Sequence, residues 1–292
     1  MPRFSVVVPA YNAQATLSET LDAVLAQRLG DWECIVVDDG SADETRAIAL
    51  AYAEGEPRLR VITQANQGSA GAYNTGVGAA TGDFVVLCSA DDILLPEHLA
   101  EMTAFIDREP GFDIYSSNGY YLKSDGSREL VYAPGEISDS MSLTAVIRNC
   151  FFSVGATYRR PLFSVVNGYR TDVFGEDYDF WLRSMAAGAK HRYLPAALSL
   201  HRLSPSQKSS NLESAYRSDI RLLTDLLASA NLSPDERRAV RESVRRRERM
   251  IAQLKGHPVR RGLRESLLRL ARRVLGKNGL RRLLRVSKGR TD

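Results

Sequence analysis

The sequence of 292 residues has no apolar run of about 18 residues, the length that a membrane-spanning helix needs. Its first residues, MPRFSVVVPAYN, hold too short an apolar segment before Pro9 to form a secretory signal. The three cysteines, Cys34, Cys88 and Cys150, are far apart, which predicts reduced thiols and argues against a disulfide framework or a zinc site. We therefore expect a cytoplasmic protein, and 44% hydrophobic residues are enough for a substantial core.

The sequence also lacks an even distribution of charge. Its net charge is +4, yet residues 234–292 hold 20 lysines and arginines against six acids, so this segment is +14 and the preceding residues are −10. An acidic body followed by a basic tail indicates that the two parts face different partners. No zinc-binding, helix-turn-helix or RNA-binding-sheet motif accompanies the tail. We therefore do not expect nucleic acid as a partner. The alternative function is that of a nucleic-acid-binding protein that acts through its basic tail.

Apolar periodicity alternates between strand and helix. Continuous apolar runs predict buried strands at 4–8, 33–37, 58–63 and 84–88, and helical spacing predicts helices at 13–28, 45–54 and 71–80. Further along, a helix and a strand are expected within 97–121, helices at 139–148 and 176–187, and extended segments at 151–158 and 192–201. This order is typical of an α/β fold with a mixed, mostly parallel sheet flanked by helices. Residues 207–292 read as a basic helical C-terminal extension.

Polar residues directly follow three of the predicted strands: PAYN after the first, DDGS after the second and SADD after the fourth. Ligands bind beyond the carboxyl ends of parallel strands, so these loops predict one shared site. Asp38 and Asp39 suit either a turn in which Ser41 caps the next helix or a carboxylate that accepts hydrogen bonds from a ligand. Asp91 and Asp92 suit either a cap for the following helix or a site for Mg²⁺ or Mn²⁺.

A third group of acids begins the helix predicted at 176–187. Glu176, Asp177 and Asp179 lie at its N-terminus, where the helix dipole stabilises negative charge. The same acids stand next to Phe174 and Phe180, and a carboxylate that aromatic surface partly desolvates suits a general base. From the residues alone, both interpretations stay open.

Taken together, these motifs resemble the inverting glycosyltransferases of family 2, which have the GT-A fold. The matching stretches are SVVVPAYN, ECIVVDDGSADET, the segment from NQGSAGAYN to SADD, and FGEDYDFWLR, in the family's order and spacing over about residues 5–201. The resemblance implies a catalytic domain at 1–206, with a nucleotide-binding half at 1–95 and an acceptor-binding half at 96–206. It also implies a nucleotide-sugar donor and a Mn²⁺ or Mg²⁺ cofactor.

The resemblance further implies roles for single residues. Residues at the nucleotide would be Pro9, Tyr11, Asp39, Gly68, Ser89 and Ala90. Among these, Tyr11 would lie against the base and Asp39 would accept its N3–H, while Asp91 would hold the cation. Asp177, beside Glu176, would be the general base that deprotonates the acceptor hydroxyl. His201 and Arg202 are candidates to contact the diphosphate, with a surface strand end as the alternative.

Three features depart from the family pattern or narrow the reaction. Ser89 replaces the first acid of the family's Asp-x-Asp metal motif, which predicts a weaker metal site because serine adds no charge. Tyr73 stands where many members carry arginine. The Gln-x-x-Arg-Trp motif of processive members is absent. The expected reaction is therefore inverting transfer of one sugar from a UDP- or dTDP-sugar to a hydroxyl of a saccharide or lipid-linked saccharide in cell-surface polysaccharide synthesis.

The basic tail contains an amphipathic segment at 259–286. Its apolar residues Leu263, Leu267, Leu270 and Val274 fall on one helical face and the arginines fall mainly elsewhere. Such a segment suits an anionic membrane surface, so we expect a peripheral protein on the cytoplasmic face. Packing on its own domain or on a second copy in a homo-oligomer is the alternative. A nucleotidyltransferase is disfavoured, because the loop PAYNAQATL lacks the glycine-rich, basic phosphate loop of that class.

Overall fold

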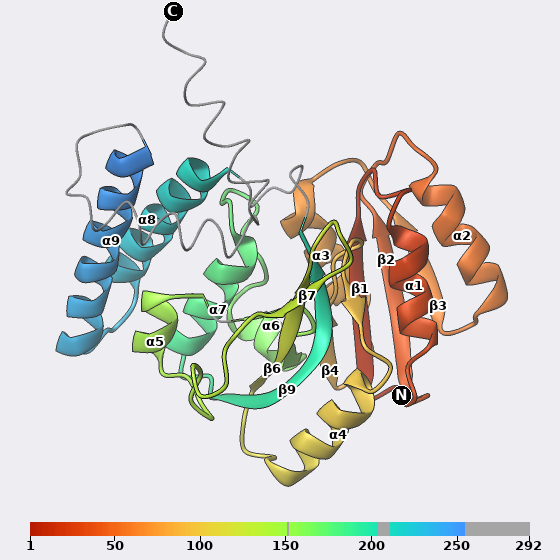
Figure 1. The fold of residues 1–292 in the computed structure, drawn as a ribbon, viewed down its shortest axis with the longest axis horizontal. Coiled ribbons are helices and arrows are strands. Elements are labelled where there is room, and N and C mark those ends of the chain that lie inside the picture. Colours follow the sequence, from red (N-terminus) through yellow and green to blue (C-terminus); the bar gives the residue numbers. More distant parts are fainter. Residues whose placement is uncertain (151, 204–210, 255–292) are drawn as a thin grey trace, which may run out of the picture.

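The computed structural model describes residues 1–150, 152–203 and 211–254. A mixed sheet forms the centre of this part of the chain (Figure 1). Its strands are β1 Phe4–Ala10, β2 Trp32–Asp38, β3 Leu59–Thr63, β4 Phe84–Leu87, β5 Ile93–Leu94, β6 Ile114–Leu122, β7 Arg128–Leu130, β8 Thr157–Arg159 and β9 His191–Arg202. They lie in the order β3-β2-β1-β4-β8-β6-β9-β5, and β7 pairs with β6.

The strands β3, β2, β1 and β4 form a parallel half-sheet, and β8 joins it to the rest by antiparallel pairing with β4. The helices are α1 Leu17–Leu25, α2 Thr45–Gly55, α3 Gly68–Ala79, α4 His98–Arg108, α5 Leu143–Arg148, α6 Pro161–Val165, α7 Glu176–Ala186, α8 Leu212–Ser229 and α9 Pro234–Leu254. None of the described helices is long and apolar enough to cross a membrane.

Alternating side chains of the parallel strands build two separate cores. Val6 and Val8 of β1 belong to a cluster with α1, α2 and α4, whereas Val7 points to the opposite face. On that opposite face Val7 and the alternate residues of β2 join a cluster with α3, α5, α7, α8 and α9. Both faces of the sheet are therefore covered, which explains why these strands read as continuous apolar runs.

The sequence predicted the first four strands and the α/β class, and the structure confirms both. Several boundaries differ. The helix predicted at 13–28 begins only at Leu17, because the preceding loop is held by a hydrogen bond from the Ala13 N–H to Thr45 Oγ1 at 2.7 Å. The strand predicted at 151–158 is short, with β8 beginning at Thr157. The two-residue β5 and the hairpin partner β7 were not predicted, and the tail segment 259–286 lies outside the described residues.

The first part of the C-terminal extension packs on the catalytic body. Leu222, Leu223 and Leu226 of α8 and Val240 of α9 share the hydrophobic cluster that contains Trp181 of α7. In Figure 1 the pair α8–α9 stands outside α5 and α7, which lie between it and the sheet. The hydrophobic core therefore continues across the position where the sequence changes from acidic to basic.

Candidate active site

The loops after β1, β2 and β4 lie at one edge of the sheet, because these strands are parallel neighbours. At this edge Ala10 pairs with Asp38, and the Asp39 N–H donates to the Ala10 carbonyl oxygen at 2.9 Å. Just beyond β4, the Cys88 N–H donates to the Val7 carbonyl oxygen at 3.2 Å. The structure thus brings together the three polar loops that the sequence singled out.

The first loop is tied to the second. Pro9 lies within β1, and Tyr11 directly follows the strand with 53% of its surface exposed. Asn12 has a φ of 49°, a conformation that asparagine adopts more readily than most residues. Its N–H donates to Ser41 Oγ at 3.0 Å, and its Oδ1 accepts from the Ala42 N–H at 2.9 Å. The capping role considered for Ser41 is not observed, because Glu44 precedes α2 and Ser41 holds the Tyr11 loop instead.

The two adjacent acids of the second loop have different surroundings. Asp38 Oδ1 accepts from the Ser41 N–H at 3.1 Å, which is the contact of a turn. Asp39 is buried, and its Oδ1 accepts from the Gln67 N–H at 2.9 Å and from Gln64 Nε2 at 2.7 Å. Gln67 is the residue before α3, so the Asp39 carboxylate is fixed in position by the start of that helix.

The third loop, Ser89–Asp92, directs its two acids differently. Asp92 is buried, and its Oδ1 accepts from His201 Nδ1 at 3.0 Å and from the Arg202 N–H at 3.3 Å. Asp91 is partly exposed, and its carbonyl oxygen accepts from Arg202 Nε at 3.2 Å. Neither acid caps the following helix, whose preceding residue is Glu97. Asp92 therefore joins the loop to β9, and Asp91 is the more exposed of the two acids.

Charge couples His201 to this loop. Burial disfavours the charged form of His201, but the negative charge of Asp92 and its hydrogen bond outweigh burial and raise the pKa of the imidazole. Burial also raises the pKa of Asp92, and His201 opposes that rise. Asp91 and Asp177 add smaller stabilisation of the His201 cation, which places both acids in the electrostatic surroundings of this ring. The end of β9 thus supplies positive charge beside the acids.

The acids of the fourth motif begin α7 directly after Gly175, which has a φ of 86°. Glu176 is buried, and it accepts a hydrogen bond from Ser69 Oγ of α3. Asp177 is exposed, and its Oδ1 accepts from the Tyr178 N–H at 2.8 Å. Asp179, the third acid of the cluster, instead pairs with Arg183 Nη2 at 2.6 Å and is structural. Of the three acids, Asp177 is the exposed one.

The first turn of α3 links two of the acid groups. The Gln67 N–H donates to Asp39, and Ser69 Oγ, two residues later, donates to Glu176. Gly68 lies between them with a φ of 76°, and a Cβ there would meet no atom within 4 Å. The loops of β2 and α7 therefore approach each other at the N-terminus of α3, where backbone N–H groups favour negative charge.

Tyr73 of α3 fills the space between the third loop and α7. It is buried and packs against Tyr169 with ring centroids 5.2 Å apart. Ser89 lies within hydrogen-bonding reach of its hydroxyl, and burial together with the negative charges of Glu176 and Asp177 keeps its pKa well above the usual value. A neutral tyrosine and a neutral serine therefore meet where the family pattern has charged residues. The sequence flagged both departures but could not show that they are in contact.

The donor set at Asp91 fits a hard divalent cation that completes its shell from a substrate. Mg²⁺ is commonly bound through one or two carboxylates plus substrate phosphates rather than by a full protein cage. The described residues contain no cluster of three or more acids, histidines and cysteines with metal-binding geometry. Asp92 is buried against His201 and Asp91 is partly exposed, so Asp91 is the carboxylate of this loop that a cation can reach.

A parallel half-sheet with acidic loops at its carboxyl edge, continued by strands of mixed direction, is the GT-A architecture of glycosyltransferases. TarS 1–349 of S. aureus in complex with UDP-GlcNAc matches 89% of this chain and 77% of its own, with a TM-score of 0.70 and 21% identity. The mannosyltransferase PcManGT of Pyrobaculum calidifontis, solved with GDP-Man and Mn²⁺, matches 100% of this chain and 88% of its own, with a TM-score of 0.67 and 18% identity.

The chain belongs to glycosyl transferase family 2, whose sequence model matches residues 5–166. A PGL/p-HBAD biosynthesis glycosyltransferase of Mycobacterium bovis is 41% identical over 188 residues, which are 62% of this chain and 69% of that protein. The glycosyltransferase EpsJ of Bacillus subtilis is 31% identical over 219 residues, 70% of this chain but only 62% of EpsJ. The succinoglycan biosynthesis protein ExoO of Rhizobium meliloti is 30% identical over 211 residues, 68% of this chain and 60% of ExoO. The chain thus spans about three fifths of the length of EpsJ and of ExoO.

Proposed function

We propose that this glycosyltransferase moves one sugar from a UDP- or dTDP-sugar to an acceptor hydroxyl, with inversion at the anomeric carbon. The observation that carries the proposal is the meeting of three acid groups around α3 and β9. Asp39 and Glu176 both bind the first turn of α3, and Asp92, the neighbour of Asp91, binds His201 at the end of β9. In this proposal Asp39 serves the nucleoside, Asp91 serves the diphosphate, and Asp177 serves the acceptor hydroxyl.

The nucleoside half of the donor would lie beside Tyr11 and Asp39. Both hydrogen bonds of the Asp39 side chain to the described residues use Oδ1, so Oδ2 can accept the N3–H of uracil or thymine. Tyr11 is exposed beside it and offers a flat surface for the base. Pro9 and Ala90 would border the same site, and Gly68 is exposed there, with no atom within 4 Å of a Cβ added to it.

The diphosphate half would lie between Asp91 and the end of β9. Asp91 would hold Mn²⁺ or Mg²⁺, which supplies Lewis-acid neutralisation of charge on a leaving diphosphate. His201 and Arg202 add positive charge at the same place. Ser89 offers a hydroxyl to the ribose or the phosphate and no charge.

The acceptor half would lie over α7. Asp177 is exposed at the first turn of the helix and would take the proton of the acceptor hydroxyl. Glu176, held by Ser69, fixes the position of this turn. A carboxylate that removes the proton on the side opposite the leaving diphosphate gives inversion in one displacement, without a covalent intermediate. The acceptor class that relatives such as ExoO suggest is a saccharide or lipid-linked saccharide of a cell-surface polysaccharide.

The test pairs isosteric variants of two acids with different proposed roles, Asp177 as the base and Asp39 at the nucleoside. A panel of nucleotide sugars first identifies the donor by thermal shift and by hydrolysis with Mn²⁺. Asp177→Asn should then retain nucleotide affinity but lose about 10²–10⁴-fold in turnover, because only the base is removed. Asp39→Asn should weaken nucleotide binding at an unchanged pH profile. Transfer that survives in Asp177→Asn would overturn the base assignment.

The metal site has its own test. Ser89→Asp adds the charge that the family motif has, so Mn²⁺ should bind more tightly in the presence of UDP, measured by calorimetry. Asp91→Asn should remove that binding. Equal Mn²⁺ affinity of the natural chain and Ser89→Asp would contradict the role given to position 89.

The membrane-facing part of the proposal concerns the basic C-terminal region. Exposed Arg238, Arg241, Arg245 and Arg249 recur along one side of α9, and the segment 259–286 follows outside the described residues. An arginine row of this kind is attracted to anionic lipid. The full chain should co-sediment with vesicles of phosphatidylcholine and phosphatidylglycerol but not with phosphatidylcholine alone, and removal of 255–292 should reduce the bound fraction. Equal sedimentation with and without these residues would end this proposal.

A further inference from the structure

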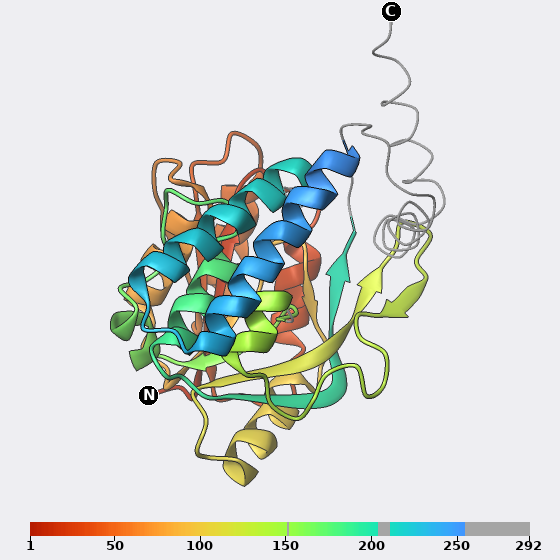
Figure 2. The ribbon, with the colours of Figure 1, turned by 90° about the vertical axis from the view of Figure 1, so that its left-hand side faces the viewer.

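The helix pair α8–α9 lies directly against the helix that carries the proposed base. In Figure 2 the two helices run side by side across the face where α5 and α7 lie. Their apolar residues share one cluster with α7. Three polar contacts also reach the segment that leads into α7: Ser218 Oγ donates to the Phe174 carbonyl oxygen, Arg221 Nη1 donates to the Asp172 carbonyl oxygen at 2.8 Å, and Arg170 Nη1 pairs with Asp225 at 2.9 Å.

One arginine of α9 differs from the others. Arg247 is only 5% exposed, whereas the arginines at 238, 241, 245 and 249 are exposed. Its Nε pairs with Asp219 Oδ2 of α8 at 2.7 Å, and its Nη2 reaches the Tyr178 hydroxyl at 3.4 Å. Its Nη1 is buried without a hydrogen-bond partner among the described residues. Burying an ion pair rarely adds stability over apolar packing, so a contribution to position is the better explanation for it.

Tyr178 is the residue next to Asp177 and lies at the meeting point of three helices. Its ring is 4% exposed, and its hydroxyl donates to the carbonyl oxygens of Val146 at 3.0 Å and Ile147 at 3.1 Å. These carbonyls belong to α5, and the Arg247 guanidinium approaches the same hydroxyl from α9. The Arg247 guanidinium also lies over the Tyr178 ring, 5.8 Å from its centroid. Rotation of the first turn of α7 would break this set of contacts.

We propose that α8–α9 is a positioning element of the active site, and that the buried pair Arg247–Asp219 holds Tyr178 and thereby the first turn of α7 with Asp177. The proposal rests on the proposed function, in which Asp177 is the base. Arg247 does not touch the substrate and acts through Tyr178. It should therefore affect turnover and leave the affinity for the donor unchanged, since Asp39 and Asp91 lie on other elements.

The test uses the full chain, with water as acceptor in hydrolysis of the donor that the panel selects. The double variant Arg247→Met with Asp219→Leu removes both charges and leaves none buried alone, so the fold is kept. We expect kcat to fall about tenfold or more at an unchanged donor KM, because small misplacements of a catalytic group are costly. Tyr178→Phe keeps the ring and removes the hydroxyl, and it should give a smaller fall of the same kind.

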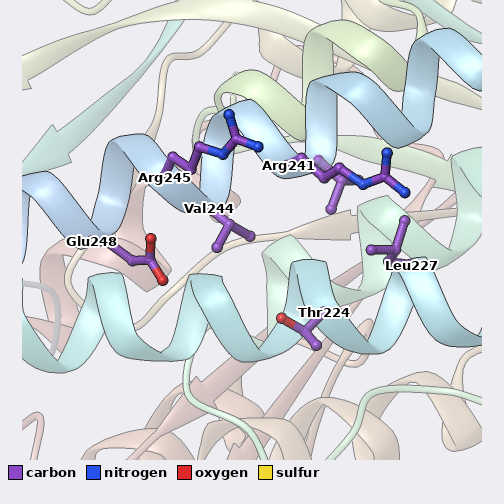
Figure 3. Close-up of a pocket in the computed structure, with 7 residues that line it drawn as sticks. Thr224, Leu227, Arg241, Val244, Arg245 and Glu248 are labelled. Atoms are coloured by element: carbon purple, nitrogen blue, oxygen red, sulfur yellow. The ribbon is translucent and has the colours of Figure 1, made fainter.

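Two matched controls separate position from packing. Val240→Ala weakens the α8–α9 packing without touching Tyr178, so it should lower Tm and leave kcat at the assay temperature unchanged. Arg217→Met makes the same chemical change at an exposed arginine of α8 that pairs with Glu213, and we expect natural kcat and KM. Arg241, which lines a groove of about 300 Å³ with Arg245, Thr224 and Leu227 (Figure 3), belongs to the proposed lipid-facing row and stays unchanged in this test.

The outcomes distinguish this inference from the proposed function. If Asp177→Asn abolishes hydrolysis while the Arg247–Asp219 double variant and Tyr178→Phe keep the natural kcat, the positioning role falls and the base assignment stands. If Asp177→Asn retains hydrolysis, the base assignment falls first. Non-additive losses in a cycle of Tyr178→Phe with the double variant would support one connected set of contacts. Additive losses would count against it.

Discussion

At the scale of single residues, Glu33 shows how one carboxylate joins four segments of the chain. Oε1 accepts from Ser5 Oγ at 2.7 Å, from the Thr81 N–H at 2.6 Å and from Thr81 Oγ1 at 2.8 Å, and Oε2 accepts from Arg60 at 2.7 Å. Burial alone would raise the pKa of Glu33, but these hydrogen bonds outweigh it and lower the pKa to about 2. In the sequence this residue only appeared as the start of a buried strand.

We predict that Glu33→Gln removes a pH-dependent part of the stability. A carboxyl whose folded pKa is depressed stabilises the fold above its unfolded pKa, near 4.5, and loses this contribution as pH falls toward about 2. Denaturant unfolding at pH 7 and at about pH 3.5 should show the natural chain losing about 1.4 kcal/mol more than the variant. The same loss in both proteins would contradict the role of Glu33.

At the scale of elements, α3 is built from small residues because it lies close to the sheet. A Cβ added at Gly76 would stand 2.4 Å from Val7 Cγ1 and 3.1 Å from Val37 Cγ2. At Gly78, on the same helix, a Cβ would meet nothing within 4 Å. The close approach brings the first turn of α3 to Asp39 and Glu176, so this packing also sets the site.

Two alanine substitutions in α3 should have opposite effects. Gly78→Ala should raise the free energy of unfolding by about 0.5–1 kcal/mol, because alanine favours helix and no clash arises. Gly76→Ala gains the same propensity but overpacks against Val7, which typically costs about 1–3 kcal/mol. Urea denaturation of both variants gives the comparison. A gain in stability at both positions would show that the helix can move away from β1 without cost.

At the scale of the whole molecule, the body and the first part of the basic extension form one packed unit. Leu222, Leu223 and Leu226 of α8 lie in the same cluster as Trp181. The sequence placed a domain boundary at residue 206 and a change from acidic to basic charge at residue 234, but the apolar contacts continue across both positions. Surface charge affects which partners a protein attracts, but the extent of a hydrophobic core depends on which apolar faces pack together.

A chain that ends at residue 206 should therefore lose its cooperative thermal transition, because α5 and α7 would expose the apolar face that α8 and α9 cover. A chain that ends at residue 254 keeps every described contact and is the control, with a Tm close to that of the full chain. Circular dichroism at 222 nm during heating gives both transitions. A cooperative transition of the 1–206 chain at the natural Tm would show that the boundary separates independent domains.

The sequence by itself determined the first four strands with the helices between them, the loops that hold the acids, and the family. It could do so because buried parallel strands read as continuous apolar runs and polar residues at their ends stand out. Only the tertiary structure decided that Asp92 is buried against His201 while the adjacent Asp91 stays partly exposed, and that Tyr73 is buried beside Tyr169. These contacts join residues that are far apart in the chain, and side-chain chemistry alone does not encode which neighbour each one meets.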